Sequence, residues 1–288
     1  MIDEEGNPLI DLNASSGFNG PRALFREITD SDTLAEYRYN GLLLSKVIYD
    51  KNSVANIMWS GDKISQINFN GHLDSDGDGT IDDDSIVYTQ LFTYGNLGRL
   101  TIISENRASY KRTPGVPPTT PPGPYLLDKR TKAIYDLTYS ATTGKLDVIN
   151  GKRGLDVTGT PFTYNNYSKT SYTYFGDNVS NVQKQNGAIN AGVNGPVVTN
   201  TGYDFLNYDS QINPYTLLPF EYKVFSLIST EFGNAKGFMM SPNSPKRISV
   251  TDLMQPIPAP VISSTAYKYD VQTYMIQGFG VNYIYKPF

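Results

Sequence analysis

Recurring Asn-Gly pairs are the feature that most constrains how this chain can fold. Both residues tolerate a positive φ, which the two-residue turn of a β-hairpin requires. Several pairs adjoin segments such as 64–69, where apolar and polar residues alternate as in a half-buried strand. The pattern therefore predicts consecutive antiparallel hairpins that need no helices to connect them. The pairs occupy positions 19–20, 40–41, 70–71, 150–151, 186–187 and 194–195.

A loose repeat of an aromatic strand, a turn and an apolar strand is superposed on these pairs. The clearest copies are 92–102 and 137–146, with a shorter copy at 37–43 and a decayed one at 172–176. Hairpins of this kind bury their apolar faces only against neighbouring hairpins. We therefore expect an all-β fold, an up-and-down antiparallel meander of hairpins curled into a barrel-like sheet.

The composition agrees with this fold, since the chain has 22 Tyr, 13 Phe, 25 Gly and 18 Pro among 288 residues. We expect one β domain over 1–288 with an N-terminal extension over 1–30, where 21–28 could form a short helix. The Pro-rich stretch 113–124 is expected to be a surface loop. Apolar residues at helical spacing predict one amphipathic helix near 219–232, packed on the sheet or plugging its open end.

Charge and residue counts exclude several classes of function. The net charge is −4 without a dense basic run, so nucleic acid is not an expected partner. The chain has no cysteine and one histidine, His72, which excludes thiolate chemistry and zinc sites built on cysteine. No apolar run approaches the ~20 residues of a membrane helix, so no transmembrane segment is expected.

The string 74–85 is the one motif with specific chemistry. Carboxylates at alternate positions of a tight loop suit Ca²⁺, which prefers six to eight oxygen ligands. Gly79 falls at the sixth position, where the loop turns sharply, so the string is similar to the calcium loops of EF-hands and of acidic repeats in exported adhesion proteins. The expected ligands are Asp74, Asp76, Asp78, Thr80, Asp82 and Asp84.

The string departs from an EF-hand at its twelfth position. Ser85 stands where the bidentate Glu would be, so Asp83 or Asp84 would have to close the site. The flanking segments are strand-like instead of helical. We therefore expect a weak structural Ca²⁺ site that closes a hairpin connection, and the alternative is a solvated acidic turn.

The chain also resembles a group of uncharacterised exported proteins of Bacteroidetes, often lipoproteins, built from degenerate hairpins of the YD type. The resemblance rests on 94–100 with its Gly-Arg-Leu ending, on 139–146, and on the segments 208–220, 241–248 and 267–270. It covers most of the chain from Tyr37 onward, although the Asp that follows Tyr in that repeat is missing here. It implies a porin-like curled sheet and no known activity.

The resemblance further implies an exported protein, periplasmic or at the cell surface, as an outer-membrane lipoprotein with a lipid anchor upstream. The expected function is a non-enzymatic structural or binding module of the cell envelope, with a glycan or another envelope protein as partner. Because Tyr-x-Tyr spacing puts both rings on one face of a strand, the rings either pack the core or form an exposed glycan-binding face. A glycosidase built on two carboxylates is a further, weaker alternative.

Overall fold

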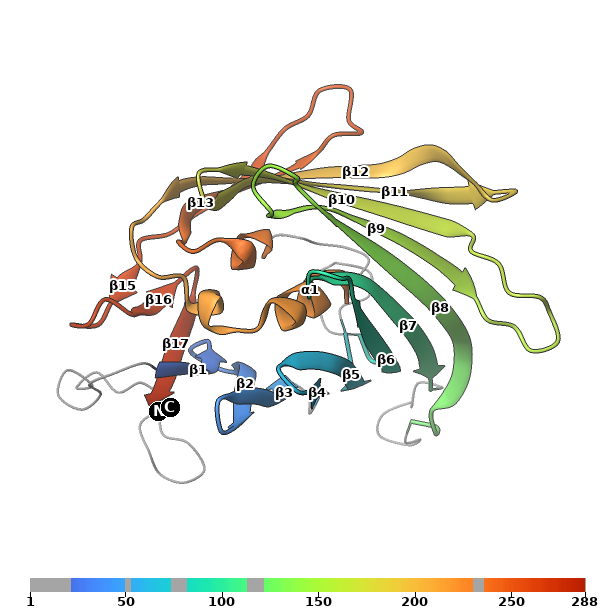
Figure 1. Ribbon diagram of the computed structural model, residues 1–288, viewed down its shortest axis with the longest axis horizontal. Coiled ribbons are helices and arrows are strands. Elements are labelled where there is room, and N and C mark those ends of the chain that lie inside the picture. The colour runs from blue at the N-terminus through green and yellow to red at the C-terminus, as the bar shows by residue number, and fades with distance from the viewer. Residues whose placement is uncertain (1–21, 50–52, 74–81, 113–121, 230–235, 288) are drawn as a thin grey trace.

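A single curled sheet of 17 antiparallel strands makes up the fold in the computed structural model, as expected from the sequence (Figure 1). The structure describes residues 22–49, 53–73, 82–112, 122–229 and 236–287. The strands are β1 (Arg22–Ile28), β2 (Thr33–Asn40), β3 (Leu43–Tyr49), β4 (Val54–Ser60), β5 (Lys63–Gly71), β6 (Ser85–Tyr94), β7 (Leu100–Lys111), β8 (Leu126–Tyr139), β9 (Leu146–Leu155), β10 (Asn166–Phe175), β11 (Asn178–Asn190), β12 (Val193–Tyr208), β13 (Pro245–Asp252), β14 (Val261–Ser264), β15 (Lys268–Tyr269), β16 (Met275–Gly278) and β17 (Val281–Pro287).

Strand order in the sheet follows the sequence almost throughout. Each strand from β1 to β13 pairs with the next one along the chain, and β15, β16 and β17 do the same. β1 also pairs with β17, which brings the two ends of the described chain side by side. No ladder joins β14 to β15 in the described part of the chain, so the sheet is curled but not closed.

Three short helical segments lie inside the curl, where Figure 1 shows them between the blue and the yellow strands. They are η3 (Pro214–Leu217), α1 (Phe220–Ile228) and η4 (Gly237–Met240), and together they form what we call the plug. α1 buries Tyr222, Val224, Phe225, Leu227 and Ile228. The predicted helix is therefore present from 220, after Pro219 as its N-cap, and its predicted residues 230–232 lie outside the described part of the chain.

The N-terminal extension predicted over 1–30 is wrong for 22–28, which form the buried strand β1 instead of an extension or a helix. Because this strand carries charged side chains, its sequence does not indicate that it is buried. Arg22 forms an ion pair of 2.5 Å with Asp270, and Glu27 accepts a hydrogen bond from Tyr215 of η3 at 2.9 Å. Burial of these charges is possible because each meets a partner inside the curl.

Most of the Asn-Gly pairs do not form turns. Asn40-Gly41 does, but Gly151, Gly187 and Gly195 lie within strands, and 19–20 are outside the described residues. A side chain at Gly151 would come within 3.1 Å of the ring of Tyr135 on the neighbouring strand, so this glycine makes room for a ring. Eight glycines in turns of the described chain have positive φ, namely Gly41, Gly61, Gly98, Gly144, Gly159, Gly176, Gly192 and Gly280.

Candidate functional site

The acidic loop can be followed only in part. Asp74, Asp76, Asp78 and Thr80 lie outside the described residues, so the Ca²⁺ site stays a prediction. Asp84 lies 3.9 Å from the ammonium of Lys111, and its backbone oxygen lies 3.0 Å from Nδ1 of His72. His72 therefore contacts the loop backbone.

The residues on either side of the Pro-rich stretch contact the described end of the acidic loop, at Asp83. Tyr125, which follows the Pro-rich stretch, donates a hydrogen bond of 3.0 Å to the backbone oxygen of Asp83. Arg112, which precedes that stretch, lies 4.0 Å from the Asp83 carboxylate and stacks over the ring of Tyr125. Residues that flank the Pro-rich stretch on both sides thus contact Asp83.

One end of the curl, which we call the hairpin rim, carries the short turns near 41, 61, 97, 142 and 176. At each turn, an aromatic residue pairs across the hairpin with a buried aliphatic one. Along the described chain, these pairs are Tyr39 with Leu44, Trp59 with Ile64, Tyr94 with Leu100, Tyr139 with Leu146 and Tyr174 with Val179.

Three of the aromatic residues at the hairpin rim, Trp59, Tyr94 and Tyr139, bond their hairpin to the preceding one. The backbone ladder between β7 and β8 ends at Ile102, which leaves the Leu100 carbonyl without a partner strand, and the Tyr139 hydroxyl donates to it at 2.6 Å. Tyr94 does the same for Ile64 at 2.7 Å, and the Trp59 indole does so for Leu44 at 2.8 Å. The aromatic residues of the repeat thus donate hydrogen bonds to buried backbone carbonyls that have no partner strand.

A basic residue covers the outward face of three of these rings. Lys63 lies over Tyr94 at 5.6 Å, Arg99 over Tyr139 at 5.5 Å, and Lys145 over Tyr174 at 5.2 Å from the ring centroids. Each cation directly precedes the buried aliphatic residue of its own hairpin and covers the ring of the next hairpin. Position in the repeat therefore places three cations in a row along the hairpin rim.

A cavity of about 420 Å³ opens at this row of cations, and we call it the rim cavity. Its walls come from the ends of four hairpins, from the beginning of α1 and from Met240 of η4. The lining includes four basic residues and two acidic ones, Lys63, Arg99, Lys145, Lys223, Asp177 and Glu221. The sequence indicated Arg99 and Lys145 as repeat residues, but their convergence on Lys223 requires the plug to lie inside the curl.

Lys223 of α1 is the least solvated of these cations. Burial lowers the pKa of its ammonium to about 8, and Glu221 offsets part of this effect. Asp177 lies 2.7 Å from the Lys145 ammonium, and Glu221 lies 3.1 Å from the Tyr94 hydroxyl, whose single proton goes to the nearer Ile64 carbonyl. The ion pair with Lys145 lowers the pKa of Asp177.

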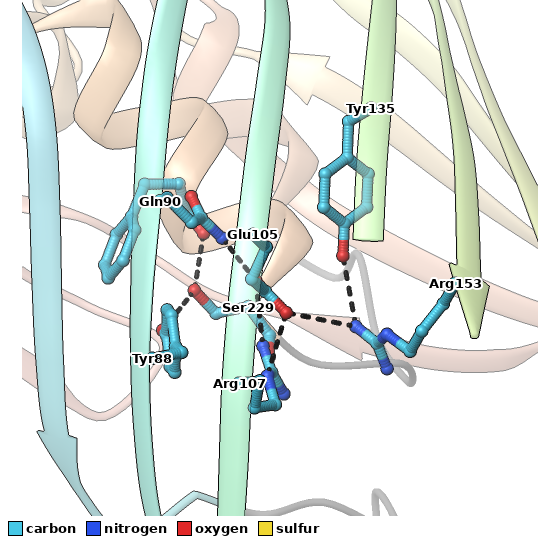
Figure 2. A network of polar contacts seen from close by, with 8 residues as sticks. Tyr88, Gln90, Glu105, Arg107, Tyr135, Arg153 and Ser229 are labelled. Carbon is cyan, nitrogen blue, oxygen red and sulfur yellow. Dashed lines mark hydrogen bonds and ion pairs between the residues drawn. The ribbon is translucent and has the colours of Figure 1, made fainter. Parts of the chain in front are cut away.

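A second polar cluster, which we call the Glu105 network, lies deeper in the curl (Figure 2). The Glu105 carboxylate is fully buried, accepts a hydrogen bond of 2.7 Å from Gln90 and lies 2.9 Å from Nε of Arg107. Arg153 reaches it at 3.8 Å across the small Ala133, which stands between them in the register. Burial disfavours the charged guanidinium of Arg107, but its ion pair with Glu105 raises the pKa above the usual value.

The Glu105 network holds the C-terminal end of α1. Arg107 donates to the backbone oxygen of Ser229, the C-cap residue, at 2.9 Å, and Tyr88 donates to the Ser229 hydroxyl at 2.8 Å. A cation is favourable at this end of a helix. The sequence showed no sign of this network, because its members lie on five different elements. Glu105 is the only carboxylate among the residues labelled in Figure 2.

A second cavity, of about 320 Å³, adjoins the Glu105 network between β8–β12 and the last turn of α1. Its lining combines the polar side chains of Arg153, Lys184 and Thr170 with the apolar ones of Ile149 and Ile228. Because Arg153 also bonds to Tyr135 at 3.0 Å, this cavity shares its wall with the network that anchors α1.

Among the comparisons with known proteins, only the one with solved structures found similar proteins. No protein-family model matches this sequence. No curated protein matches it either. The fold is similar to the crystal structure of a porin-like protein from Bacteroides vulgatus ATCC 8482, with a TM-score of 0.49 and 10% identity over 92% of this chain and 100% of that chain. It is also similar to a porin-like protein from Bacteroides uniformis ATCC 8492, with a TM-score of 0.21 and 10% identity over 77% of this chain and 96% of that chain.

The YD-type repeat family and the lipoprotein status implied by the sequence stay predictions. Among the described residues, no helix is long and apolar enough to cross a membrane.

Proposed function

We propose that this protein is a non-enzymatic module of the cell envelope that binds a small ligand in the rim cavity. The observation that supports this is the rim cavity itself, about 420 Å³ in volume and lined by charged groups that rigid hairpins and the plug position. Binding sites typically place a few polar groups in this way on a scaffold that does not move.

Catalysis by a pair of carboxylates has less support in the described residues. A glycosidase needs two carboxyl groups about 5–9.5 Å apart, one of them free to exchange a proton. The Glu105 carboxylate already contacts Gln90, Arg107 and Arg153, so its oxygens are occupied within the network. In the rim cavity, Asp177 is paired with Lys145 and its pKa is lowered, which does not suit a general acid.

A glycan bound on an exposed Tyr-rich face also has less support. Of the Tyr-x-Tyr rings, Tyr37 and Tyr172 are buried, and Tyr39 and Tyr174 pack against the core. The rings at the hairpin rim carry cations over their faces, so these faces are not available for stacking on a sugar.

Ligand-observed NMR would test the proposed binding. The probes are four sugars that differ in charge, namely glucose, glucosamine, glucuronate and glucose 6-phosphate, each at 5 mM with the purified protein. We expect saturation transfer to at least one of them. The variant Met240→Trp places an indole in the lining of the rim cavity and should abolish this transfer.

Met58→Trp is the matched control, because Met58 is 48% exposed on β4 and is not part of the cavity lining. Thermal unfolding of both variants would confirm that they fold. Transfer that persists in Met240→Trp, or no transfer to any probe, would contradict binding in the rim cavity.

Calcium is proposed as a structural ion of the loop 74–85. The alternating carboxylates would repel one another without a cation, and Ca²⁺ that binds only the folded state raises the unfolding midpoint by mass action. We expect millimolar Ca²⁺ to raise the midpoint over that in EDTA, and the double variant Asp76→Ala/Asp78→Ala to lose the increase. An equal increase in the double variant would contradict a site in this loop.

A location in the periplasm or at the cell surface completes the proposal, with an envelope protein as an alternative partner. It is supported by the acidic loop, since a weak Ca²⁺ site of ~10⁻⁴–10⁻³ M is typical of extracellular modules. Fractionation of cells that express the full-length gene, followed by globomycin treatment, would test export and lipid attachment. Recovery in the cytoplasm would contradict both.

A further inference from the structure

The rim cavity differs in charge from the rest of the molecule. The whole chain carries a net charge of −4, whereas the basic residues that line the cavity exceed the acidic ones by two. Of its two carboxylates, Asp177 is paired with Lys145, which leaves Glu221 as the one anion among Lys63, Arg99 and Lys223 in the cavity lining. The charge that remains to be balanced in this cavity is therefore positive.

The rings of the rim cavity hold these cations and do not offer a stacking surface. Arg99 and Lys145 lie over the faces of Tyr139 and Tyr174, at 5.5 and 5.2 Å from the centroids, and both rings line the cavity. The Lys145 ammonium already donates to the Asp177 carboxylate and to the Gly176 carbonyl, so it contributes charge to the cavity, and hydrogen bonds to a ligand come from Lys63, Arg99 and Lys223. The arrangement is suited to an acceptor-rich ligand and poorly suited to a neutral sugar.

Lys223 adds a fourth cation from inside the curl. It comes from α1, whereas Lys63, Arg99 and Lys145 come from three successive hairpins, so the four side chains approach the same space from two layers of the molecule. Burial makes this lysine costly to keep charged, and Glu221 offsets only part of that cost. An anionic ligand would lower that cost.

We propose that the ligand of the rim cavity is a small molecule bearing an oxyanion, a phosphate or carboxylate group, bound among Lys63, Arg99, Lys145 and Lys223. This inference rests on the proposed binding function and specifies the chemical class of its ligand. The cavity volume of about 420 Å³ accommodates a monosaccharide that carries such a group. The oxyanion accepts hydrogen bonds from the ammonium and guanidinium groups, and the remainder of the ligand lies against Leu146 and Phe220.

Isothermal titration calorimetry with the four sugars tests this proposal. Glucose 6-phosphate or glucuronate should bind at least tenfold more tightly than glucose, and glucosamine should bind no better than glucose. Which of the two anions binds more tightly distinguishes a phosphate from a carboxylate ligand. The variants Arg99→Gln and Lys223→Gln should each weaken binding of the anionic sugar about tenfold or more, because each removes a cation and keeps the length of the side chain approximately.

Lys169→Gln is the matched control, since Lys169 is exposed on β10 and does not line the cavity; it should leave the affinity unchanged. Raising NaCl from 50 to 500 mM should weaken binding of the anions but not of glucose. Glucose that binds as tightly as the anionic sugars would overturn the oxyanion proposal and leave binding in the rim cavity in place. Binding of none of the four would overturn both.

Discussion

At the scale of residues, tyrosine hydroxyls complete the sheet where its strands separate. The pairings between β1 and β2, β3 and β4, β5 and β6, and β7 and β8 all stop before the hairpin rim, and an aromatic donor supplies the next hydrogen bond in each case. A buried carbonyl without a hydrogen-bond partner is costly. These aromatic residues therefore stabilise the sheet as donors as well as by burying apolar area.

Removing one such hydroxyl tests this role. Tyr139→Phe keeps the ring and leaves the buried Leu100 carbonyl without its donor, so we expect a loss of about 1–2 kcal/mol in the free energy of unfolding. Urea denaturation measures the difference. Tyr164→Phe is the control, because the hydrogen bonds described for the chain include none from that hydroxyl, and it should change stability by less than about 0.5 kcal/mol. Equal losses in the two variants would contradict the role of the hydroxyl.

Lys223 should reduce the stability of the unliganded protein below pH 8. Burial lowers its pKa to about 8 from 10.5, so the unfolded chain binds more protons than the folded one between these values, and this residue makes stability rise with pH across that interval. Lys223→Met should therefore stabilise the protein at pH 7, by up to about 3 kcal/mol, and the gain should disappear toward pH 10.5. Urea denaturation at pH 7, 9 and 10.5 measures this, with Lys169→Met as control. A gain independent of pH would point to improved packing instead.

At the scale of elements, the η3–α1 part of the plug is attached to the sheet at both of its ends. Tyr215 of η3 bonds to Glu27 of β1, and the C-cap of α1 bonds to Arg107 of β7. α1 has nine residues, too few to be a stable helix on its own, so its tertiary contacts maintain it. The position of Lys223 in the rim cavity depends on these two attachments.

Glu105→Gln should show how strongly the sheet holds α1. The change leaves Arg107 and Arg153 charged and partly buried without their carboxylate, which typically costs about 3–5 kcal/mol. Asp156→Asn is a matched control, since Asp156 pairs with Lys132 at 3.1 Å near the surface and should cost less than about 1 kcal/mol. Urea denaturation of both variants gives the comparison. Similar costs would contradict an anchoring role for Glu105.

The sequence predicts an element when the residues that determine it lie close together in the chain. The hairpins at 40–41, 94–100 and 139–146 follow from residues close together in the chain, and α1 follows from its apolar spacing and Pro219. β1 could not be predicted in this way, because the burial of Arg22 and Glu27 depends on Asp270 and Tyr215, more than 180 residues away. The rim cavity likewise requires α1 to enter the curl, which no local pattern indicates.

At the scale of the whole molecule, the seam between β14 and β15 is the one break among the described strands. Side chains bridge it in place of a ladder: Thr265 accepts a hydrogen bond of 2.9 Å from the backbone of Phe279, and Tyr267 donates one of 2.5 Å to Pro245. The strands on either side have four and two residues. Such a region has little backbone pairing to protect it.

Amide hydrogen exchange should reveal this difference in local stability. Amides of β14–β16 should exchange through local opening, with free energies well below the global value, whereas those of β7 and β8 should exchange only on global unfolding. Mass spectrometry of peptides from 261–278 and from 100–111 measures the two regions under identical conditions. Equal protection in both would show that side-chain bridges close the sheet as firmly as a ladder does.

The pairing of β1 with β17 has a consequence for how the chain acquires its structure. Successive hairpins form from residues close in sequence. Most of the sheet can therefore grow strand by strand from one early hairpin, at a small entropic cost of loop closure. β1 already pairs with β2, its neighbour in the chain, yet its other edge has to wait for β17, the last of the described strands. Until that contact forms, β1 presents an unpaired edge, the kind of surface through which incompletely folded chains associate wrongly. The pairing of β1 with β17 is therefore the folding step that removes this edge.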